Sequence, residues 1–232
     1  MGGVRWPMIS IVSDLERDGF AIFPGVLPEL DCDHIAAELT SIDRGAGSRM
    51  LLQQDWCSAL AKRLKQHSAL RDSLPVAAMA IQCTFFDKSA DKNWLVTLHQ
   101  DLSVPVRSRI SAKGYSGWSE KEGQLYVQPP REILEMLVGV RLHLDDCNAE
   151  NGPLRVVPGS HRMGRLSDLD ARALRDKNGE VSCIAPKGGA LLLRPLLLHS
   201  SSKAEAPSHR RVLHFLFGPA KAPGGLEWAG AI

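Results

Sequence analysis

Short apolar runs separated by turn-forming residues dominate the chain from residue 76 onward. Runs of this length between clusters of glycine, proline, asparagine and aspartate are typical of β-strands, and many in succession favour a sandwich or barrel over alternating strand–helix units. Short helical pieces are expected to interrupt them near residues 132–134 and 166–175. The expected strands are residues 77–86, 94–99, 125–127, 137–144, 154–157, 181–184, 190–193 and 212–217.

The first 75 residues have a different hydrophobic pattern. Apolar residues recur at intervals of three and four over residues 9–71, as in Trp56, Leu60 and Leu64, and this spacing predicts amphipathic helices. A short apolar run at residues 20–23 predicts one strand between the helices. This region is therefore expected to form a helical layer against a β core.

These patterns together predict a mainly β fold with flanking helices. The expected architecture is a double-stranded β-helix, the jelly roll of cupins, with an N-terminal helical layer. No internal repeat or long linker divides the sequence, so residues 1–232 are expected to form one domain, with a helical support at 1–75 and a β-helix core at 76–219. Two insertions in this core, residues 102–127 and 164–179, are long enough to cover a site.

Charge and composition favour a small-molecule partner over a nucleic acid or a membrane. Of the 232 residues, 28 are Lys or Arg and 26 are Asp or Glu, and the two signs are mixed along the chain. Apolar runs stay far below the roughly 20 residues needed to cross a bilayer. The N-terminal residues do not resemble a signal peptide, and the 5 cysteines form no C-x-x-C pair, so a cytoplasmic location without a disulfide framework is expected.

Two tripeptides carry a histidine and an aspartate with matching parity: His99-Gln-Asp101 and His143-Leu-Asp145. In a strand, residues i and i+2 project from the same face, so either pair can aim an imidazole and a carboxylate at one point. With a distant histidine such as His199, either would complete the two-histidine, one-carboxylate triad that holds non-haem iron(II). Spacing does not decide between them, since about one such tripeptide is expected by chance in this composition.

Further motifs favour the first tripeptide. In chain order these are Leu98-His-Gln-Asp-Leu102, Asn151-Gly-Pro-Leu154, Val157-Pro-Gly-Ser-His161, His199-Ser-Ser201 and Arg210-Arg211. In combination and in this order, they resemble the phytanoyl-CoA dioxygenase family of iron(II)- and 2-oxoglutarate-dependent oxygenases. The resemblance covers roughly residues 79–217.

The resemblance implies which residues hold the metal ion. His99, Asp101 and His199 match the iron ligands of the family. His199 is expected where a strand over residues 196–198 meets a loop. Asp101 favours hydroxylation over halogenation, because related halogenases replace this carboxylate with a small residue.

The resemblance also implies a site for 2-oxoglutarate. Arg210 matches the arginine that binds the far carboxylate of this cosubstrate, and a guanidinium suits this task because it can form two parallel hydrogen bonds to a carboxylate. Ser201 matches a serine that hydrogen-bonds the same cosubstrate, and Lys88 matches a lysine near it. Arg211 has the opposite strand parity, so only one of the two arginines can point inward, and a shift of the strand register by one residue would exchange their roles.

Two positions depart from the family pattern. Ser200 stands where the family has glycine, which removes no ligand. Arg141 stands where some relatives place an aromatic residue of the pocket. We expect Arg141 either to bind an anionic group, a carboxylate of the substrate or of 2-oxoglutarate, or to form an ion pair with Asp145 or Asp146.

Other polar and aromatic residues near these motifs receive weaker assignments. Gln82 and Thr84 share one face of the first core strand and are candidates to contact 2-oxoglutarate, and His143 is expected to line the pocket. Structural roles are expected for His209 at the surface, for His214 in the core, and for Tyr115 and Trp118 in packing a loop onto the barrel.

The activity implied by the resemblance is hydroxylation of a C–H bond of a small organic substrate, with release of succinate and carbon dioxide. The cofactors are then iron(II), 2-oxoglutarate and dioxygen, with ascorbate as a stimulant. An anionic substrate such as an amino acid or a natural-product intermediate would suit Arg141, and the protein is expected to act as a monomer or homodimer.

Two alternatives stay open. One is a zinc or manganese enzyme of cupin-like fold that acts as a hydrolase or isomerase, since zinc accepts the same three ligands. The other is a non-catalytic binding module on the same scaffold.

Overall fold

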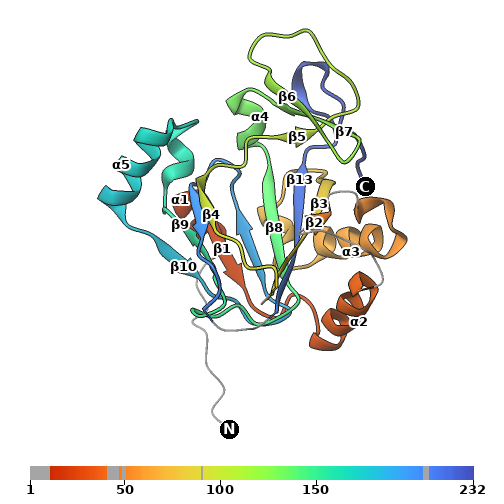
Figure 1. Cartoon of the computed structure of the whole chain (residues 1–232). Helices are drawn as coiled ribbons and strands as arrows, with labels where there is room; N and C mark the ends of the chain where they lie inside the picture. The colour runs from red at the N-terminus through yellow and green to blue at the C-terminus, as the bar shows by residue number, and fades with distance from the viewer. Residues whose placement is uncertain (1–10, 41–46, 49–50, 90, 206–208) are drawn as a thin grey trace.

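Two antiparallel sheets and a layer of helices make up most of the computed structural model, which describes residues 11–40, 47–48, 51–89, 91–205 and 209–232 (Figure 1). Residues 1–10, which the sequence assigns to the helical layer, lie outside the described residues. The helices are α1 (Ile11–Asp18), α2 (Glu29–Thr40), α3 (Asp55–Gln66), α4 (Arg131–Glu135) and α5 (Asp168–Asn178). The strands are β1 (Phe20–Phe23), β2 (Gly47–Ser48), β3 (Met79–Lys88), β4 (Val96–His99), β5 (Val104–Pro105), β6 (Ser116–Lys121), β7 (Gln124–Gln128), β8 (Val138–His143), β9 (Leu154–Val156), β10 (Val181–Cys183), β11 (Ala190–Leu193), β12 (His199–Ser201) and β13 (Arg210–Gly218).

The two main sheets pack face to face. The larger has the order β1-β11-β8-β13-β3-β2 and the smaller has the order β10-β9-β12-β4, with antiparallel pairing throughout. Leu154 and Val156 of the smaller sheet form a buried cluster with Leu191 and Leu193 of the larger one. Burial of alternate residues from both inner faces stabilises such a sandwich. The predicted mainly β, jelly-roll class is confirmed.

The helical layer covers the other face of the larger sheet. Leu15, Leu60 and Leu64 are buried in one cluster with Phe215 and Phe217 of β13. The four-residue spacing of Leu60 and Leu64 places both on the same face of α3, as the sequence predicts. Figure 1 shows α2 and α3 on one side of the sheets and α5 on the opposite side.

Both insertions have regular structure of their own. The first contains the three-stranded sheet β5-β7-β6. Trp118 of β6 and Tyr115, which directly precedes this strand, pack against a buried cluster, as expected. The second contains α5, which begins after Ser167 because the Ser167 side chain accepts a hydrogen bond from the Asp170 N–H. The expected helices in the core region correspond to α4 and α5.

The prediction of a strand over residues 196–198 is wrong. The chain turns at Pro195 and Leu196 and bends at Leu197, and His199 is the first residue of β12 instead of the end of a strand. Leu196, Leu197 and Leu198 enter three different buried clusters. A strand directs its side chains to only two faces, so three diverging leucines require a turn.

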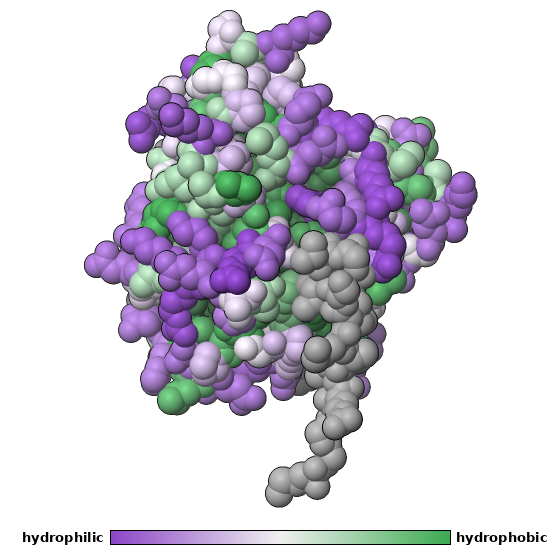
Figure 2. All heavy atoms as spheres, turned by 180° about the vertical axis from the view of Figure 1, so that it is seen from behind, coloured by the Kyte–Doolittle hydropathy of each residue, from purple (hydrophilic) through white to green (hydrophobic). Residues whose placement is uncertain are grey.

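No helix in the part of the chain that the structure describes is long and apolar enough to cross a bilayer. Seen from behind, hydrophilic side chains project around the face, and apolar side chains show between them over its middle (Figure 2).

Candidate active site

His99 and His199 lie opposite each other on two adjacent strands of the smaller sheet. They are directly paired in the register of β4 and β12, and their ring centroids lie 4.2 Å apart. The Nδ1 atom of His99 lies 2.8 Å from the Thr97 carbonyl oxygen, and that of His199 lies 2.9 Å from the Leu197 carbonyl oxygen. A carbonyl only accepts, so Nδ1 carries the proton in both rings and each Nε2 keeps a lone pair for a metal ion.

Asp101 completes a cluster of three ligand groups. Its Oδ1 lies 3.7 Å from Nε2 of His99, and its Oδ2 lies 3.7 Å from Nε2 of His199. The three ligand atoms lie within 4.8 Å of one another. Two ligand atoms that are each about 2.1 Å from one ion lie about 3 to 4 Å apart, so the aspartate–histidine distances suit a single metal ion, and a small approach of the side chains would bring all three groups onto it.

Burial keeps the His199 ring ready to bind a cation. Burial lowers the pKa of His199 to about 4, and the nearby Asp101 carboxylate only partly offsets this. The ring is therefore neutral at pH 7, as a metal ligand must be. Two imidazoles and one carboxylate on one side of an ion are typical of non-haem iron(II) sites.

Gln100 fixes the ligand tripeptide to two neighbouring segments. Although β4 ends at His99 and the predicted strand alternation does not extend through the tripeptide, the Gln100 side chain is directed to other segments: its Nε2 donates to the Gly164 and Leu196 carbonyls at 2.8 and 2.6 Å. Its Oε1 accepts from the Leu166 N–H at 3.0 Å. A side chain with three such bonds has little rotational freedom, so the backbone between the ligands is held in place.

The Val157–His161 motif supports the distal ligand. The hydroxyl of Ser160 accepts a hydrogen bond from the Leu198 N–H at 2.9 Å, and the Val157 N–H donates to the Leu198 carbonyl. These bonds pair both backbone groups of the residue before His199, which would otherwise be buried without partners. The motif therefore shapes the turn that presents His199.

A cavity of about 360 Å³ opens beside the three ligands. This volume lies within the range of small-molecule sites. The walls combine apolar side chains, such as Leu134 and Leu216, with polar ones from both sheets and from the first insertion. The polar and aromatic lining residues are Gln82, Thr84, Phe86, Trp94, His99, Gln100, Asp101, Ser103, Lys121, Tyr126, Gln128, Arg141, His199, Ser201, Arg210 and His214.

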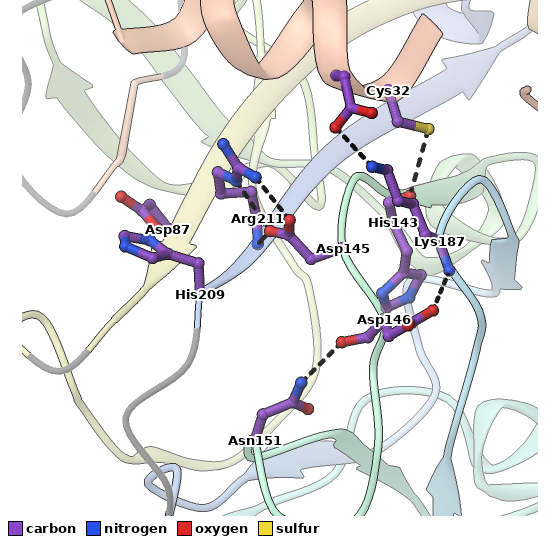
Figure 3. A network of polar contacts seen from close by, with 10 residues as sticks. Cys32, Asp87, His143, Asp145, Asp146, Asn151, Lys187, His209 and Arg211 are labelled. Atoms are coloured by element: carbon purple, nitrogen blue, oxygen red, sulfur yellow. Dashed lines mark hydrogen bonds and ion pairs between the residues drawn. The ribbon is translucent and has the colours of Figure 1, made fainter. Parts of the chain in front are cut away.

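Arg210 lies buried at the cavity wall, and Arg211 points elsewhere. Nε of Arg210 donates to the Asn151 carbonyl at 3.1 Å, which assigns a role to the Asn151-Gly-Pro motif. No acidic partner of Arg210 occurs among the described residues. Arg211 instead forms a two-pronged ion pair with Asp145, at 2.8 and 2.6 Å (Figure 3). The expected strand register, with Arg210 facing inward, is therefore the one that forms.

Lys88 and Ser201 form a hydrogen-bonded pair next to Arg210. Nζ of Lys88 donates to Oγ of Ser201 at 2.8 Å and to the Ser202 carbonyl, and Lys88 pairs with Arg210 in the register of β3 and β13. Burial lowers the pKa of Lys88 to about 8, and Arg210 and Arg141 act in the same direction. Ser201 lines the cavity, whereas Lys88 lies behind it.

Ser200 and Gly152 show how the surrounding backbone fits the site. Ser200, the departure from the family's glycine, donates its hydroxyl to Glu180 at 2.8 Å and takes no part in lining the cavity. Gly152 has a φ of +66°, and a Cβ at this position would lie 2.5 Å from the Ser202 carbonyl oxygen and 3.1 Å from Nζ of Lys88. Only glycine therefore allows this turn to close around the buried lysine.

The expected ion pair of Arg141 with Asp145 or Asp146 is absent from the described residues. Asp145 is already paired with Arg211, and Asp146 accepts from the backbone N–H of Lys187 (Figure 3). Arg141 instead lines the cavity, with its guanidinium carbon 5.2 Å from the centre of the Phe86 ring.

His214 is a cavity residue that the sequence reasoning missed. The expectation that it is buried is correct, but it also lines the cavity, with Nε2 3.8 Å from Oδ2 of Asp101. Burial lowers its pKa to about 3, so the ring is neutral. The signal was present in the sequence: Arg210 and His214 are four residues apart on one strand and therefore share a face.

The second tripeptide does not form a metal site. Asp145 binds Arg211, and His143, although buried, lines no part of the cavity, contrary to the expectation. Neither ring nitrogen of His143 has a hydrogen-bond partner among the described residues. Gln82 and Thr84 do line the cavity, and His209 is exposed beside Asp87, as expected.

A jelly roll with two histidines and an aspartate at one cavity defines a class, the non-haem metalloenzymes of cupin-like fold. The chain belongs to the phytanoyl-CoA dioxygenase (PhyH) family, which it matches over residues 15–212. No curated protein matches it in sequence. Family and ligand set agree on iron(II) and 2-oxoglutarate as the cofactors, as the sequence predicts.

Solved structures share the fold at low sequence identity. SnoK, a non-haem α-ketoglutarate-dependent carbocyclase from nogalamycin biosynthesis, is 15% identical, with a TM-score of 0.68 over 91% of this chain and 84% of SnoK. AviO1 from Streptomyces viridochromogenes is 20% identical, with a TM-score of 0.66 over 95% of this chain and 99% of AviO1. HygX from Streptomyces hygroscopicus, crystallised with nickel and 2-oxoglutarate, is 20% identical, with a TM-score of 0.61 over 93% of this chain and 88% of HygX.

Metal binding distinguishes the two tripeptides. We expect His99→Ala and Asp101→Ala each to abolish stoichiometric binding of nickel(II), a redox-stable substitute for iron(II), because each removes one of three ligands. His143→Ala, which removes a histidine of the second tripeptide, should bind nickel(II) like the wild type. Isothermal titration calorimetry measures this directly, and loss of binding in His143→Ala alone would contradict the assignment.

The buried His143 ring predicts a pH dependence of stability. Burial, with Arg141 and Arg210 nearby, lowers its pKa to about 3 from an ordinary value of 6.5. Between these two values the unfolded chain binds a proton that the folded protein does not, so the free energy of unfolding falls as the pH drops through this window.

His143→Ala should remove this contribution. Between pH 7.0 and 5.5, the wild type should lose about 1 kcal/mol more stability than the variant in urea unfolding. Equal losses would mean that His143 is not the titrating group.

Proposed function

We propose that the protein is an iron(II)- and 2-oxoglutarate-dependent oxygenase that hydroxylates a small organic substrate. The observation that carries the proposal is the convergence of His99, Asp101 and His199 beside a buried arginine, Arg210, that has no acidic partner among the described residues. A metal site alone would also suit a zinc enzyme, but that alternative gives no reason for the arginine. A binding module would need neither group.

His99, Asp101 and His199 would hold the iron and leave the remaining coordination positions facing the cavity. Once bound, iron(II), 2-oxoglutarate and dioxygen supply the oxidation of a C–H bond, with conversion of 2-oxoglutarate to succinate and carbon dioxide. Asp101 supports hydroxylation over halogenation, since its carboxylate occupies the position that a halide would need.

Arg210 and Ser201 would bind the far carboxylate of 2-oxoglutarate. A guanidinium can form two charge-assisted hydrogen bonds to a carboxylate. Because Lys88 donates to Oγ of Ser201, the hydroxyl hydrogen of Ser201 is directed away from Lys88. In the structure this hydroxyl makes a long hydrogen bond of 3.4 Å to the Gly152 carbonyl oxygen, which a carboxylate oxygen of the cosubstrate would replace. Lys88 is thus a positioning residue that also adds positive charge near this carboxylate.

The apolar walls would exclude water from the reacting groups. Leu134, Leu137 and Leu216 line the cavity, and the first insertion adds Tyr126 beside them. A drier site strengthens the charge interactions that orient the cosubstrate. The first insertion is also well placed to vary with the substrate, since it lines the cavity and loops on a rigid scaffold usually carry specificity. No residue of the second insertion, 164–179, lines the cavity, so the expectation that this segment covers the site is not met.

Succinate formation tests the activity. The purified protein with iron(II), ascorbate and 2-oxoglutarate should release succinate in a dioxygen-dependent manner, and an added substrate should raise the rate above the uncoupled background. His99→Ala should abolish both rates. Turnover of a substrate without dioxygen or 2-oxoglutarate would favour the zinc or manganese alternative.

The two adjacent arginines offer a matched pair of variants. We expect Arg210→Met to weaken 2-oxoglutarate binding to the nickel(II)-loaded protein by about 10- to 100-fold, because a charge-assisted pair with a carboxylate is lost. Arg211→Met should change this affinity by less than about threefold while lowering the free energy of unfolding, because Asp145 loses its partner. Titration calorimetry and urea unfolding measure the two effects, and equal losses of affinity would show that Arg210 is not the specific contact.

A further inference from the structure

Arg141 is a buried cation to which the proposed function assigns no role. Its side chain is only 7% exposed, and its Nε has no hydrogen-bond partner among the described residues. Burial of a guanidinium without a compensating anion strongly opposes folding, because the lost hydration is not replaced. The stacking on Phe86 offsets only part of this loss, since a cation–π contact is much weaker than an ion pair in a buried site.

The acidic groups near Arg141 all have other roles. Asp145 is held by Arg211, and Asp146 by the backbone of Lys187 and, through its own carbonyl, by Asn151. Asp101 attracts Arg141 electrostatically, but its oxygens face the two histidines. Hence no protein anion among the described residues neutralises Arg141.

With iron(II) and 2-oxoglutarate bound, the cavity would still carry excess positive charge. Of the described lining residues, Lys121, Arg141 and Arg210 are basic and Asp101 is the only acidic one. With iron(II) they carry five positive charges, against three negative charges from Asp101 and doubly charged 2-oxoglutarate. One further anionic group in the cavity would reduce this excess, and Arg141 is the lining cation with no partner.

The sheet register separates Arg141 from the 2-oxoglutarate end of the cavity. Arg141 pairs with His214 of β13, and His214 pairs with Thr84 of β3, so these three residues form one row across the inner face. Arg210 lies four residues before His214 on β13, so the Cα atoms of these two residues are about 14 Å apart along the strand. The long side chains bring the two guanidinium groups nearer than this, and Arg210 lowers the pKa of Arg141, so a single carboxylate at Arg210 leaves Arg141 as a second cation beside it. The far carboxylate of 2-oxoglutarate is assigned to Arg210 and the near one to the metal ion, so neither requires Arg141.

We infer that Arg141 binds a carboxylate of the substrate, and that the substrate is therefore a small organic acid. This inference rests on the proposed function, because it assigns 2-oxoglutarate to Arg210. Arg141 would anchor one end of the substrate in the row of His214, whose ring also lies next to Asp101, and so hold a C–H bond near the metal site.

The Oε1 atom of Gln82 indicates a second polar group on the substrate. The side chain of Gln82 donates to the Thr84 hydroxyl at 2.7 Å, and its own Oε1 is buried without a hydrogen-bond partner among the described residues. Gln82 lies two residues from Thr84 on the same face of β3, in the row next to Arg141. A hydroxyl or ammonium group on the acid would pair with this oxygen, so hydroxy acids and amino acids are the preferred class.

Binding to a non-reacting complex tests the inference. The protein is loaded with nickel(II) and saturated with 2-oxoglutarate. It is then titrated by calorimetry with the L-α-amino acids and with 2-hydroxy acids of three to six carbons. The amide of each acid is titrated in a parallel experiment. We expect at least one acid to bind about tenfold or more tightly than its amide, because only the acid pairs with the guanidinium.

Three variants identify the residue responsible. Arg141→Met should lower the affinity for that acid to the level of its amide while changing 2-oxoglutarate affinity by less than about threefold. Arg141→Lys should retain part of the preference. Arg109→Met is the matched control, since this exposed arginine lies over Trp118 outside the cavity, and it should behave like the wild type. Circular dichroism confirms that each variant is folded.

Two results would overturn the inference. One is that no acid in the panel binds better than its amide. The other is that Arg141→Met weakens the binding of 2-oxoglutarate as much as Arg210→Met does, which would make Arg141 part of the cosubstrate site. If the wild type fails to bind 2-oxoglutarate at all, the proposed function fails instead, and the same panel on the nickel(II)-loaded protein still tests Arg141.

Discussion

The antiparallel pairing of β4 with β12 is the interaction on which the site depends. It places His99 opposite His199, and the carbonyls of Thr97 and Leu197 then fix which nitrogen of each ring carries the proton. Both imidazoles are therefore oriented by backbone that the sheet already holds, so little conformational freedom is left to lose when a metal binds. Pre-organised ligands of this kind raise affinity mainly by lowering that cost.

Charge organises the rest of the cavity. Arg141, Arg210 and Lys88 are all buried without an acidic partner among the described residues, although their desolvation opposes folding. Groups that destabilise the folded protein in this way are characteristic of binding sites, because a bound ligand supplies the missing interactions. Binding of doubly charged 2-oxoglutarate and of an acidic substrate would then stabilise the fold as well as fill the site.

Much of the fold followed from the sequence, because alternating short strands and helical spacing are local signals. The motifs around His99-Gln-Asp101 favoured it over the second tripeptide, the family resemblance assigned Arg210 to the cavity, and strand parity then directed Arg211 outward. What local patterns could not give were contacts fixed by pairing between distant strands. The turn at residues 196–198, the position of His214 beside Asp101, and the choice of Asp145 for Arg211 instead of Arg141 all depend on which strands become neighbours.

The side chain of Gln100 links the candidate metal site to the second insertion. It belongs to the ligand tripeptide, yet it holds the backbone of Gly164 and Leu166 just before α5. A protein engineer who wishes to exchange this helix for another should therefore place the graft junction at Asp168 or later. A junction upstream of that point would remove backbone groups that hydrogen-bond Gln100, and so loosen the segment that carries His99 and Asp101.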